Sequence, residues 1–190
     1  YSTGTQISRK DFEGGNKTIC FNRLRELGFT IVSKKKDFNF YDTLIKFIEQ
    51  SKTNNLKIQG YRNKIENLSI AISFGKGNIA RIPWISFLYD GQTTSHGIYP
   101  VYLYYKEYDI LILAYGLSET IPPEINWSFD TPPETISDFF QKKGIKPKRY
   151  GSSYIFKSYN INDLDPTIIN EDLLEIIQFY KKQMIIQTET

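Results

Sequence analysis

Apolar and polar residues alternate through the middle of the chain, which is the pattern of strands with one buried face. Apolar residues occupy every second position over residues 68–74, so a strand is predicted there. Two further strands are predicted over 81–88 and 98–106. A turn near residues 107–109 is expected to return the chain into another strand over 110–116, as a hairpin.

Helical spacing of apolar residues flanks these strands. One helix is predicted by a stripe at i, i+3, i+4 and i+7 that consists of Tyr41, Leu44, Ile45 and Ile48. A final helix is predicted after Asp165-Pro166 by a second stripe, which consists of Leu173, Ile176, Ile177, Tyr180 and Met184. Between them, residues 131–134 have the form of a capping box, and Gly144 suits the end of the helix that this box would start. A strand is expected over 154–159.

Helices therefore surround a central run of strands. This order predicts an α+β fold with a mixed, mainly antiparallel curved sheet and flanking helices. A length of 190 residues suits one domain with a small appended element. Residues 1–35 are interpreted as an N-terminal extension of unknown role, with a short helix from Thr18 to Gly28 and a strand over 29–32, and residues 36–190 as the main domain.

Composition narrows the class of protein. A hydrophobic share of 40% with 24% charged residues is ordinary for a globular domain. One cysteine and one histidine exclude an internal disulfide and argue against a zinc site. A net charge of +3 gives no strong overall attraction to nucleic acid, although a local patch is enough to bind phosphate. No apolar run reaches membrane-span length and no signal peptide is visible, so a cytoplasmic location is expected by default.

Aromatic residues are unusually frequent, with 14 Tyr, 13 Phe and 2 Trp. Most are expected in the core, but Tyr and Trp also suit surfaces that stack on flat ligands. The sequence has no G-x-x-x-x-G-K-[ST] phosphate loop, so nucleotide hydrolysis and a bound cofactor are not expected. His96 lacks an accompanying nucleophile and carboxylate pattern, so no catalytic residue is assigned.

Five short motifs occur in one order along the chain. They are S-F-G-x-G-N at 73–78, I-P-W at 82–84, G-I-Y-P-V-x-L-Y-Y at 97–105, L-A-Y-G at 113–116 and Y-G-x-S-Y at 150–154. Together they closely resemble the N-terminal domain of the McrB family, the DNA-recognising part of a modification-dependent restriction system. The resemblance extends over about residues 41–184 and is absent from residues 1–35.

The resemblance implies a domain that binds double-stranded DNA carrying a modified cytosine of the 5-methylcytosine type by base flipping. Extruding a base costs on the order of a few kcal/mol, which flat aromatic walls and hydrogen bonds to the base edge must offset. The positions that match the family's pocket are Trp84, Tyr99, Leu103 and Tyr150. Trp84 and Tyr150 are implied as stacking walls, with Tyr99 and Leu103 beside the substituted edge of the base. Without the resemblance, Trp84 and Leu103 would be assigned to the core.

The turn Gly75-Lys76-Gly77-Asn78 is expected to contact DNA. Its two glycines permit positive φ and close backbone approach, so the turn is suited to enter a groove. An ordinary hairpin turn is the alternative. In relatives an aromatic residue can stand at the middle position and fill the gap left by the flipped base. Lys76 departs from that pattern, which leaves phosphate contact as a further interpretation.

Two other groups of residues are expected to contact DNA. Thr94 and Ser95 belong to a polar loop that suits hydrogen bonds to phosphates and base edges. Lys148 and Arg149 belong to a basic run that flanks Tyr150, where phosphates would pass over the rim of a pocket for a flipped nucleotide.

The resemblance also implies partners, namely an AAA+ GTPase region of the same polypeptide and a separate nuclease subunit. The isolated domain is therefore expected to be a binding module and not an enzyme. Alternatives are a single-stranded nucleic-acid or RNA-binding module, a non-catalytic assembly domain whose aromatic residues are all core, and a base-modifying enzyme such as a glycosylase. The last needs a general base, for which Asp90 and Glu107 are the nearest candidates in sequence.

Overall fold

The structure is a computed structural model and describes residues 38–146 and 149–188. In this part of the chain, three α-helices and a 3-10 helix accompany a sheet of six strands. The elements in chain order are α2 (Tyr41–Ser51), β1 (Lys64–Ile65), β2 (Leu68–Lys76), β3 (Asn78–Leu88), β4 (Ile98–Tyr105), η2 (Lys106–Tyr108), β5 (Ile110–Leu117), α3 (Ile136–Gln141), β6 (Tyr154–Asn160) and α4 (Pro166–Thr188).

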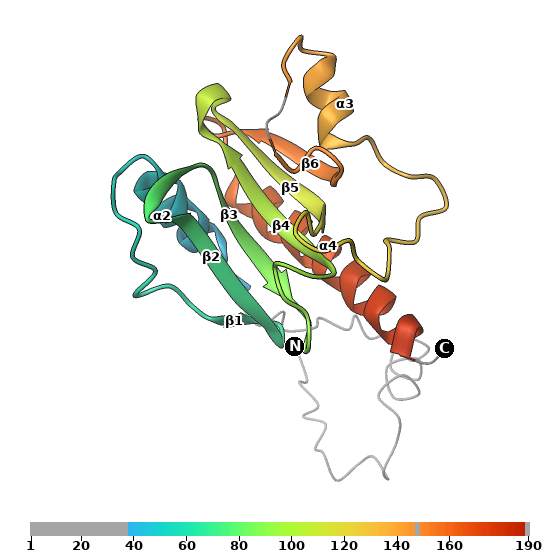
Figure 1. The fold of residues 1–190 in the computed structure, drawn as a ribbon. Coiled ribbons are helices and arrows are strands. Elements are labelled where there is room, and N and C mark those ends of the chain that lie inside the picture. The colour runs from blue at the N-terminus through green and yellow to red at the C-terminus, as the bar shows by residue number, and fades with distance from the viewer. Residues whose placement is uncertain (1–37, 147–148, 189–190) are drawn as a thin grey trace, which may run out of the picture. The chain divides into compact units, whose positions relative to one another are not determined.

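The six strands form one sheet in which spatial order equals chain order, β1-β2-β3-β4-β5-β6. Every pair of neighbouring strands is antiparallel, as Figure 1 shows. The tight connection between β4 and β5 is η2, after which Asp109 takes a left-handed φ of 52° and accepts a hydrogen bond from the Tyr104 hydroxyl at 3.2 Å. The predicted α+β class is confirmed, with strand pairing that is antiparallel and not mixed.

Helices α2 and α4 cover one face of the sheet and lie behind it in Figure 1. Phe40 and Tyr102 stack in this layer with ring centroids 6.2 Å apart, and Phe40 meets Phe87 edge-on at 5.3 Å. All five residues of the stripe predicted for the final helix are buried. In α2 the predicted stripe is only partly right, because Phe47 is fully buried while Tyr41 and Ile45 are only partly buried. Side chains of α2 and α4 therefore cover this face of the sheet completely enough to form the core.

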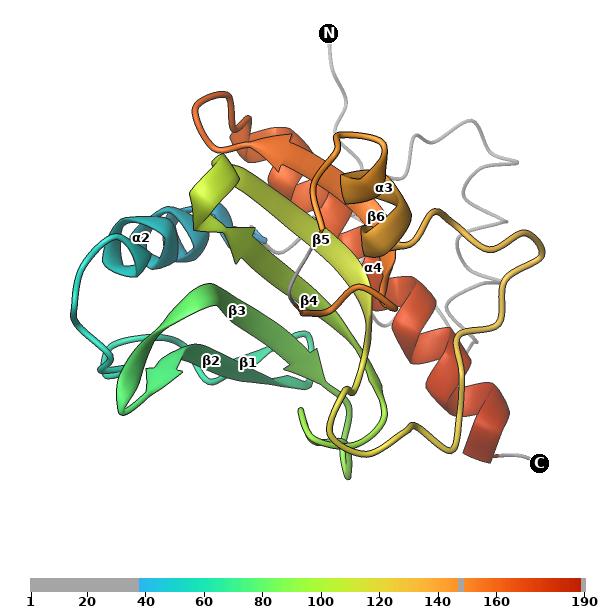
Figure 2. The same ribbon diagram turned by 45° about the horizontal axis from the view of Figure 1, so that its top comes forward.

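The sheet opens between β3 and β4. These strands pair over only three residues of β3, from Trp84 opposite Leu103 to Ser86 opposite Val101. The first half of β3 pairs with β2 alone, after an irregularity in register between Ser73 and Gly75. Figure 2 shows β3 diverging from β4 toward the β2–β3 turn. An irregularity of this kind bends a strand, and here it turns the β2–β3 hairpin away from the rest of the sheet.

Helix α3 starts later than the sequence predicts. The prediction of a capping box at residues 131–134 is wrong. The N-cap is Thr135, whose side chain accepts a hydrogen bond from the Asp138 N–H at 3.1 Å. The reason is tertiary: the Glu134 carbonyl accepts from the Ile155 N–H at 2.8 Å, so residues 134–135 run extended beside β6. Gly144 follows the helix with φ of 70°, as its expected role at the end requires.

The N-terminal predictions lie outside the described residues. They are the helix from Thr18 to Gly28, the strand over 29–32 and the extension over 1–35. Within the described ranges, none of the helices has the length and apolar character that crossing a bilayer requires.

Candidate nucleic-acid interface

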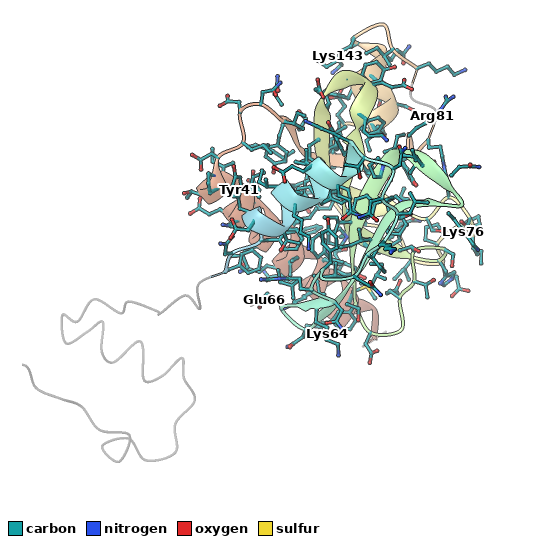
Figure 3. All side chains as sticks on the ribbon, turned by 90° about the vertical axis from the view of Figure 1, so that its left-hand side faces the viewer. Tyr41, Lys64, Glu66, Lys76, Arg81 and Lys143 are labelled. Atoms are coloured by element: carbon teal, nitrogen blue, oxygen red, sulfur yellow. The ribbon has the colours of Figure 1, made fainter. Side chains whose placement is uncertain are left out.

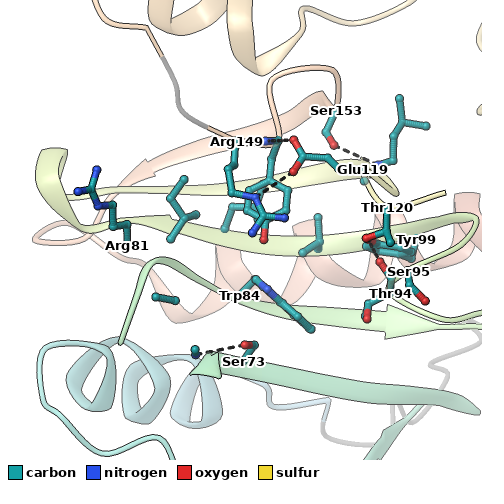
Figure 4. Close-up of a pocket in the computed structure, with 18 of the residues that line it drawn as sticks. Ser73, Arg81, Trp84, Thr94, Ser95, Tyr99, Glu119, Thr120, Arg149 and Ser153 are labelled. Atoms are coloured by element: carbon teal, nitrogen blue, oxygen red, sulfur yellow. Dashed lines mark hydrogen bonds and ion pairs between the residues drawn. The ribbon is translucent and has the colours of Figure 1, made fainter. Parts of the chain in front are cut away.

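A cavity of about 480 Å³ lies where β3 leaves β4 (Figure 4). Its walls come from the β2–β3 turn, the first half of β3, the loop at residues 94–95, strands β4 and β5, and residues 149–153. These segments are far apart in the sequence, and the antiparallel sheet brings them together. A volume in the range of about 300–1,000 Å³ is typical of pockets that hold small molecules, so the cavity can accept a group the size of a nucleotide base.

Alternation along β4 decides which side chains face the cavity. Tyr99, Val101 and Leu103 line it, whereas Tyr102 points the other way and its hydroxyl donates to the Ile169 carbonyl of α4 at 3.5 Å. The register places Trp84 opposite Leu103, so the indole faces the same side. Leu103 is fully buried, while Trp84 is half-buried at the wall of the cavity.

Tyr99 is held rigidly at the side of the cavity. Its hydroxyl donates to the Thr94 carbonyl at 2.9 Å, and the residue is 7% exposed. Burial, and to a smaller degree Tyr150 and Glu119, raise the pKa of Tyr99 well above its ordinary value. Gly116 stands opposite Tyr99 in β5, and a Cβ there would lie 2.7 Å from the Tyr99 carbonyl oxygen. Because glycine has no Cβ, Gly116 leaves room for the backbone and ring of Tyr99.

Tyr150 forms the wall beyond β5, in a segment anchored by Glu119. The Tyr150 N–H donates to the Glu119 carboxylate, and the Arg149 Nε donates to its other oxygen at 3.1 Å. The Arg149 guanidinium carbon lies 4.9 Å from the centre of the Tyr150 ring, a cation–π contact. Burial raises the pKa of Tyr150, while Arg149 and the nearby Trp84 side chain act in the opposite direction. The Trp84 and Tyr150 side chains, the two aromatic walls of the cavity, thus lie next to each other.

The β2–β3 turn forms the outer edge of the cavity. Gly75 has φ of 123°, and a Cβ there would lie 2.0 Å from the Asn78 carbonyl oxygen, so only glycine fits. Gly77 has φ of 78° but open space around it. The Lys76 side chain is exposed and has no ion pair within the described ranges. The turn thus requires glycine at its base and presents at its tip a lysine with no ion-pair partner among the described residues.

Cations gather on the side of the molecule where the cavity opens. Figure 3 shows Lys76 and Arg81 at the same edge of the molecule, with Lys143 at its top. Arg81 lines the cavity and also a neighbouring hollow of about 30 Å³ that includes Lys146. In the part of the chain that the structure describes, Arg81 and Lys146 form no ion pair, whereas Arg149 is paired with Glu119. An unpaired cation is available to a phosphate.

Ten of the twelve residues predicted for the site line this cavity. They are Gly75, Lys76, Asn78, Trp84, Thr94, Ser95, Tyr99, Leu103, Arg149 and Tyr150. Gly77 belongs to the same turn but is not among the lining residues, and Lys148 lies outside the described residues. Of the acids considered as general bases, neither Asp90 nor Glu107 lines the cavity.

Ten of the twenty lining residues were not predicted from the sequence, and among them Arg81, Glu119 and Ser153 bring charge or hydrogen bonds to the cavity. The sequence does indicate Arg81, since it is a charged residue three positions before Trp84 in a strand with one apolar face. Nothing in the sequence indicates Glu119, because its hydrogen bonds reach residues 30 and 31 positions away. Ser153 likewise acts through a distant contact, accepting a hydrogen bond from the Leu117 N–H at 3.0 Å.

Comparison with known proteins defines the class of this domain. A family model described as the MrcB-like, N-terminal domain matches residues 31–123, which include β1 to β5 and most of the cavity lining. The chain belongs to this family. It is also similar to the type IV methyl-directed restriction enzyme EcoKMcrB subunit of Escherichia coli strain K12, with 43% identity over 140 residues. That match covers 72% of this chain and 30% of the length of the relative.

Proposed function

We propose that this domain binds double-stranded DNA carrying a modified cytosine of the 5-methylcytosine type and holds that base, flipped out of the helix, in the cavity between β3 and β4. The observation that carries the proposal is the lining itself. Trp84 and Tyr150 supply adjacent flat walls, Leu103 supplies an apolar floor, and the cavity has a volume of about 480 Å³. Aromatic walls offset the loss of base stacking, and an apolar floor suits a methyl group.

Three further features support binding and not chemistry. Glu119 is the only carboxylate in the described lining, and it is already hydrogen-bonded to Arg149 and Tyr150. The described lining contains neither histidine nor cysteine, so no imidazole or thiol faces the cavity there. Lys76 and Arg81, which have no ion-pair partner in the described ranges, line the cavity, where the phosphates flanking a flipped nucleotide would pass.

The relative supports a role for modified DNA through its description as a methyl-directed restriction enzyme subunit. On this basis we propose that the domain serves as the target-recognition module of a restriction endonuclease. The proposed partners are an AAA+ GTPase region of the same polypeptide and a separate nuclease subunit. The location proposed for such a system is the cytoplasm, where it would meet incoming DNA.

The experiment that tests this function compares three ligands at matched salt. Fluorescence anisotropy would measure the Kd of the chain for a duplex with one 5-methylcytosine, the same duplex unmodified, and the methylated single strand. We expect the methylated duplex to bind most tightly. Equal affinities for both duplexes would refute recognition of the modification, and a preference for the single strand would favour the alternative of a single-stranded nucleic-acid binder.

A fluorescent base analogue at the target position tests base flipping separately. Its emission is quenched by stacking in the duplex, so extrusion into the cavity should change the emission when the chain binds. Binding without any change of emission would mean that the base stays in the helix.

A further inference from the structure

We infer that Glu119 is a positioning residue, which holds the Tyr150 wall in place and thereby sets how well a modified base is distinguished from an unmodified one. The inference rests on the proposed function, because it adds a residue to the same cavity. Glu119 itself lies at the rim, in the segment after β5, with a side chain that is 28% exposed.

Both oxygens of the Glu119 carboxylate are engaged. One accepts a hydrogen bond from the Tyr150 backbone N–H, and the other accepts from Arg149 Nε at 3.1 Å. Arg149 in turn places its guanidinium 4.9 Å from the centre of the Tyr150 ring. The carboxylate therefore fixes the backbone of Tyr150 directly and one face of its ring through Arg149.

Tyr150 needs such an anchor because its backbone is in an unfavourable conformation. Its φ is 63°, in the left-handed region that residues other than glycine rarely adopt. Neutral hydrogen bonds also hold the segment at residues 149–153. Those nearest Tyr150 run from the Tyr105 hydroxyl to the Arg149 carbonyl and from the Ser153 N–H to the Tyr150 carbonyl, each at 3.2 Å, and from the Ser137 N–H to the Gly151 carbonyl at 3.0 Å. A hydrogen bond to a charged acceptor is stronger than a neutral one, so Glu119 contributes most among these contacts.

The same geometry gives Arg149 a role different from the one predicted from the sequence. Its charge is balanced by Glu119 and its guanidinium lies over Tyr150, so this side chain, although 61% exposed, already has partners within the protein. Lys76 and Arg81 have no such partner in the described chain. Arg149 therefore acts with Glu119 in positioning, and the free cations are the better candidates for phosphate contact.

The test uses Glu119→Ala and Glu119→Gln, with Glu124→Ala as the matched control. Glu124 is an exposed glutamate five positions further along, outside the described lining, and its loss changes the net charge equally. The measured quantity is the ratio of Kd values for unmodified and methylated duplexes, together with the melting temperature. Glu119→Ala should lower the ratio by about tenfold, because a charge-assisted hydrogen bond is lost. Glu119→Gln should lower it by about threefold, since its carbonyl oxygen still accepts from Tyr150. Glu124→Ala should leave it unchanged.

A second readout needs no DNA. Hydrogen exchange of the Tyr150 amide, followed by NMR, should be at least about tenfold faster in Glu119→Ala than in wild type and unchanged in Glu124→Ala. Unchanged exchange would overturn the inference, whatever the DNA result.

The possible outcomes separate the inference from the proposed function. Wild type without preference for methylated DNA refutes the function. A wild-type preference that Glu119→Ala retains within twofold overturns the inference and leaves the function standing. A large fall in melting temperature, with both affinities reduced equally, would show that Glu119 only stabilises the fold, and this also overturns the inference.

Discussion

Replacing Trp84 by alanine separates a ligand-stacking tryptophan from a core tryptophan. Stacking of a base on an aromatic side chain is worth about 1–3 kcal/mol, and about 1.4 kcal/mol corresponds to a tenfold change in affinity. Trp84→Ala should therefore lower the preference for methylated duplex by about 5- to 150-fold. Burying a Trp completely stabilises a fold by about 3–5 kcal/mol relative to Ala, and Trp84 is only half-buried, so we expect a loss of about 2 kcal/mol.

Trp127 provides the control for this experiment. It is 6% exposed, its indole N–H donates to the Gly116 carbonyl at 3.0 Å, and its ring meets that of Tyr115 edge-on at 5.0 Å. Trp127→Ala should destabilise the fold by at least about 3–5 kcal/mol, because it removes a buried ring and leaves a carbonyl without its donor. Protein that remains folded should keep its preference for methylated DNA.

The assay combines anisotropy titrations of both duplexes at one salt concentration with urea denaturation of each variant. If Trp84 stacks on the base, the two variants must differ. Trp84→Ala then loses discrimination between the duplexes more than folding stability, and Trp127→Ala loses stability more than discrimination. If Trp84→Ala is as unstable as Trp127→Ala and its surviving folded fraction still prefers methylated DNA, Trp84 is a core residue. The stacking role would then be refuted.

Two other changes test the surroundings of the cavity. Arg81→Ala should weaken binding to both duplexes alike and make the plot of log K against log salt shallower by about 0.9, the value for one phosphate contact. Lys76→Ala should have the same effect. An unchanged slope would place either residue away from the DNA backbone. Gly116→Ala would set a Cβ 2.7 Å from the Tyr99 carbonyl oxygen and 2.8 Å from Val101 Cγ1. The substitution should lower the free energy of unfolding, measured by urea denaturation, by about 1–3 kcal/mol. An unchanged free energy of unfolding would show that β4 and β5 move apart easily at this position.

The sequence alone predicted strands β2 to β6 and helices α2 and α4, and it supplied ten of the twenty residues that line the cavity. Period-two alternation and short turns predicted four neighbouring strands, and the helical stripe of α4 is buried as predicted. Alternation and helical spacing are local rules, and they apply wherever the pattern is unbroken. The pocket residues came instead from the family resemblance that the five ordered motifs carry, because position in a strand alone would assign Trp84 and Leu103 to the core.

Tertiary contacts decided the rest. The start of α3 moved to Ile136 because residues 134–135 pair with β6, a contact that the capping-box pattern at 131–134 does not encode. The cavity exists because β3 and β4 pair over only three residues. Periodicity in the sequence predicts which face of the sheet a side chain lies on, but not where two neighbouring strands stop pairing. Glu119 and Tyr150 meet across 31 positions. They meet because β5, which ends just before Glu119, pairs with β6, which begins just after Tyr150, so no local pattern in the sequence marks the contact.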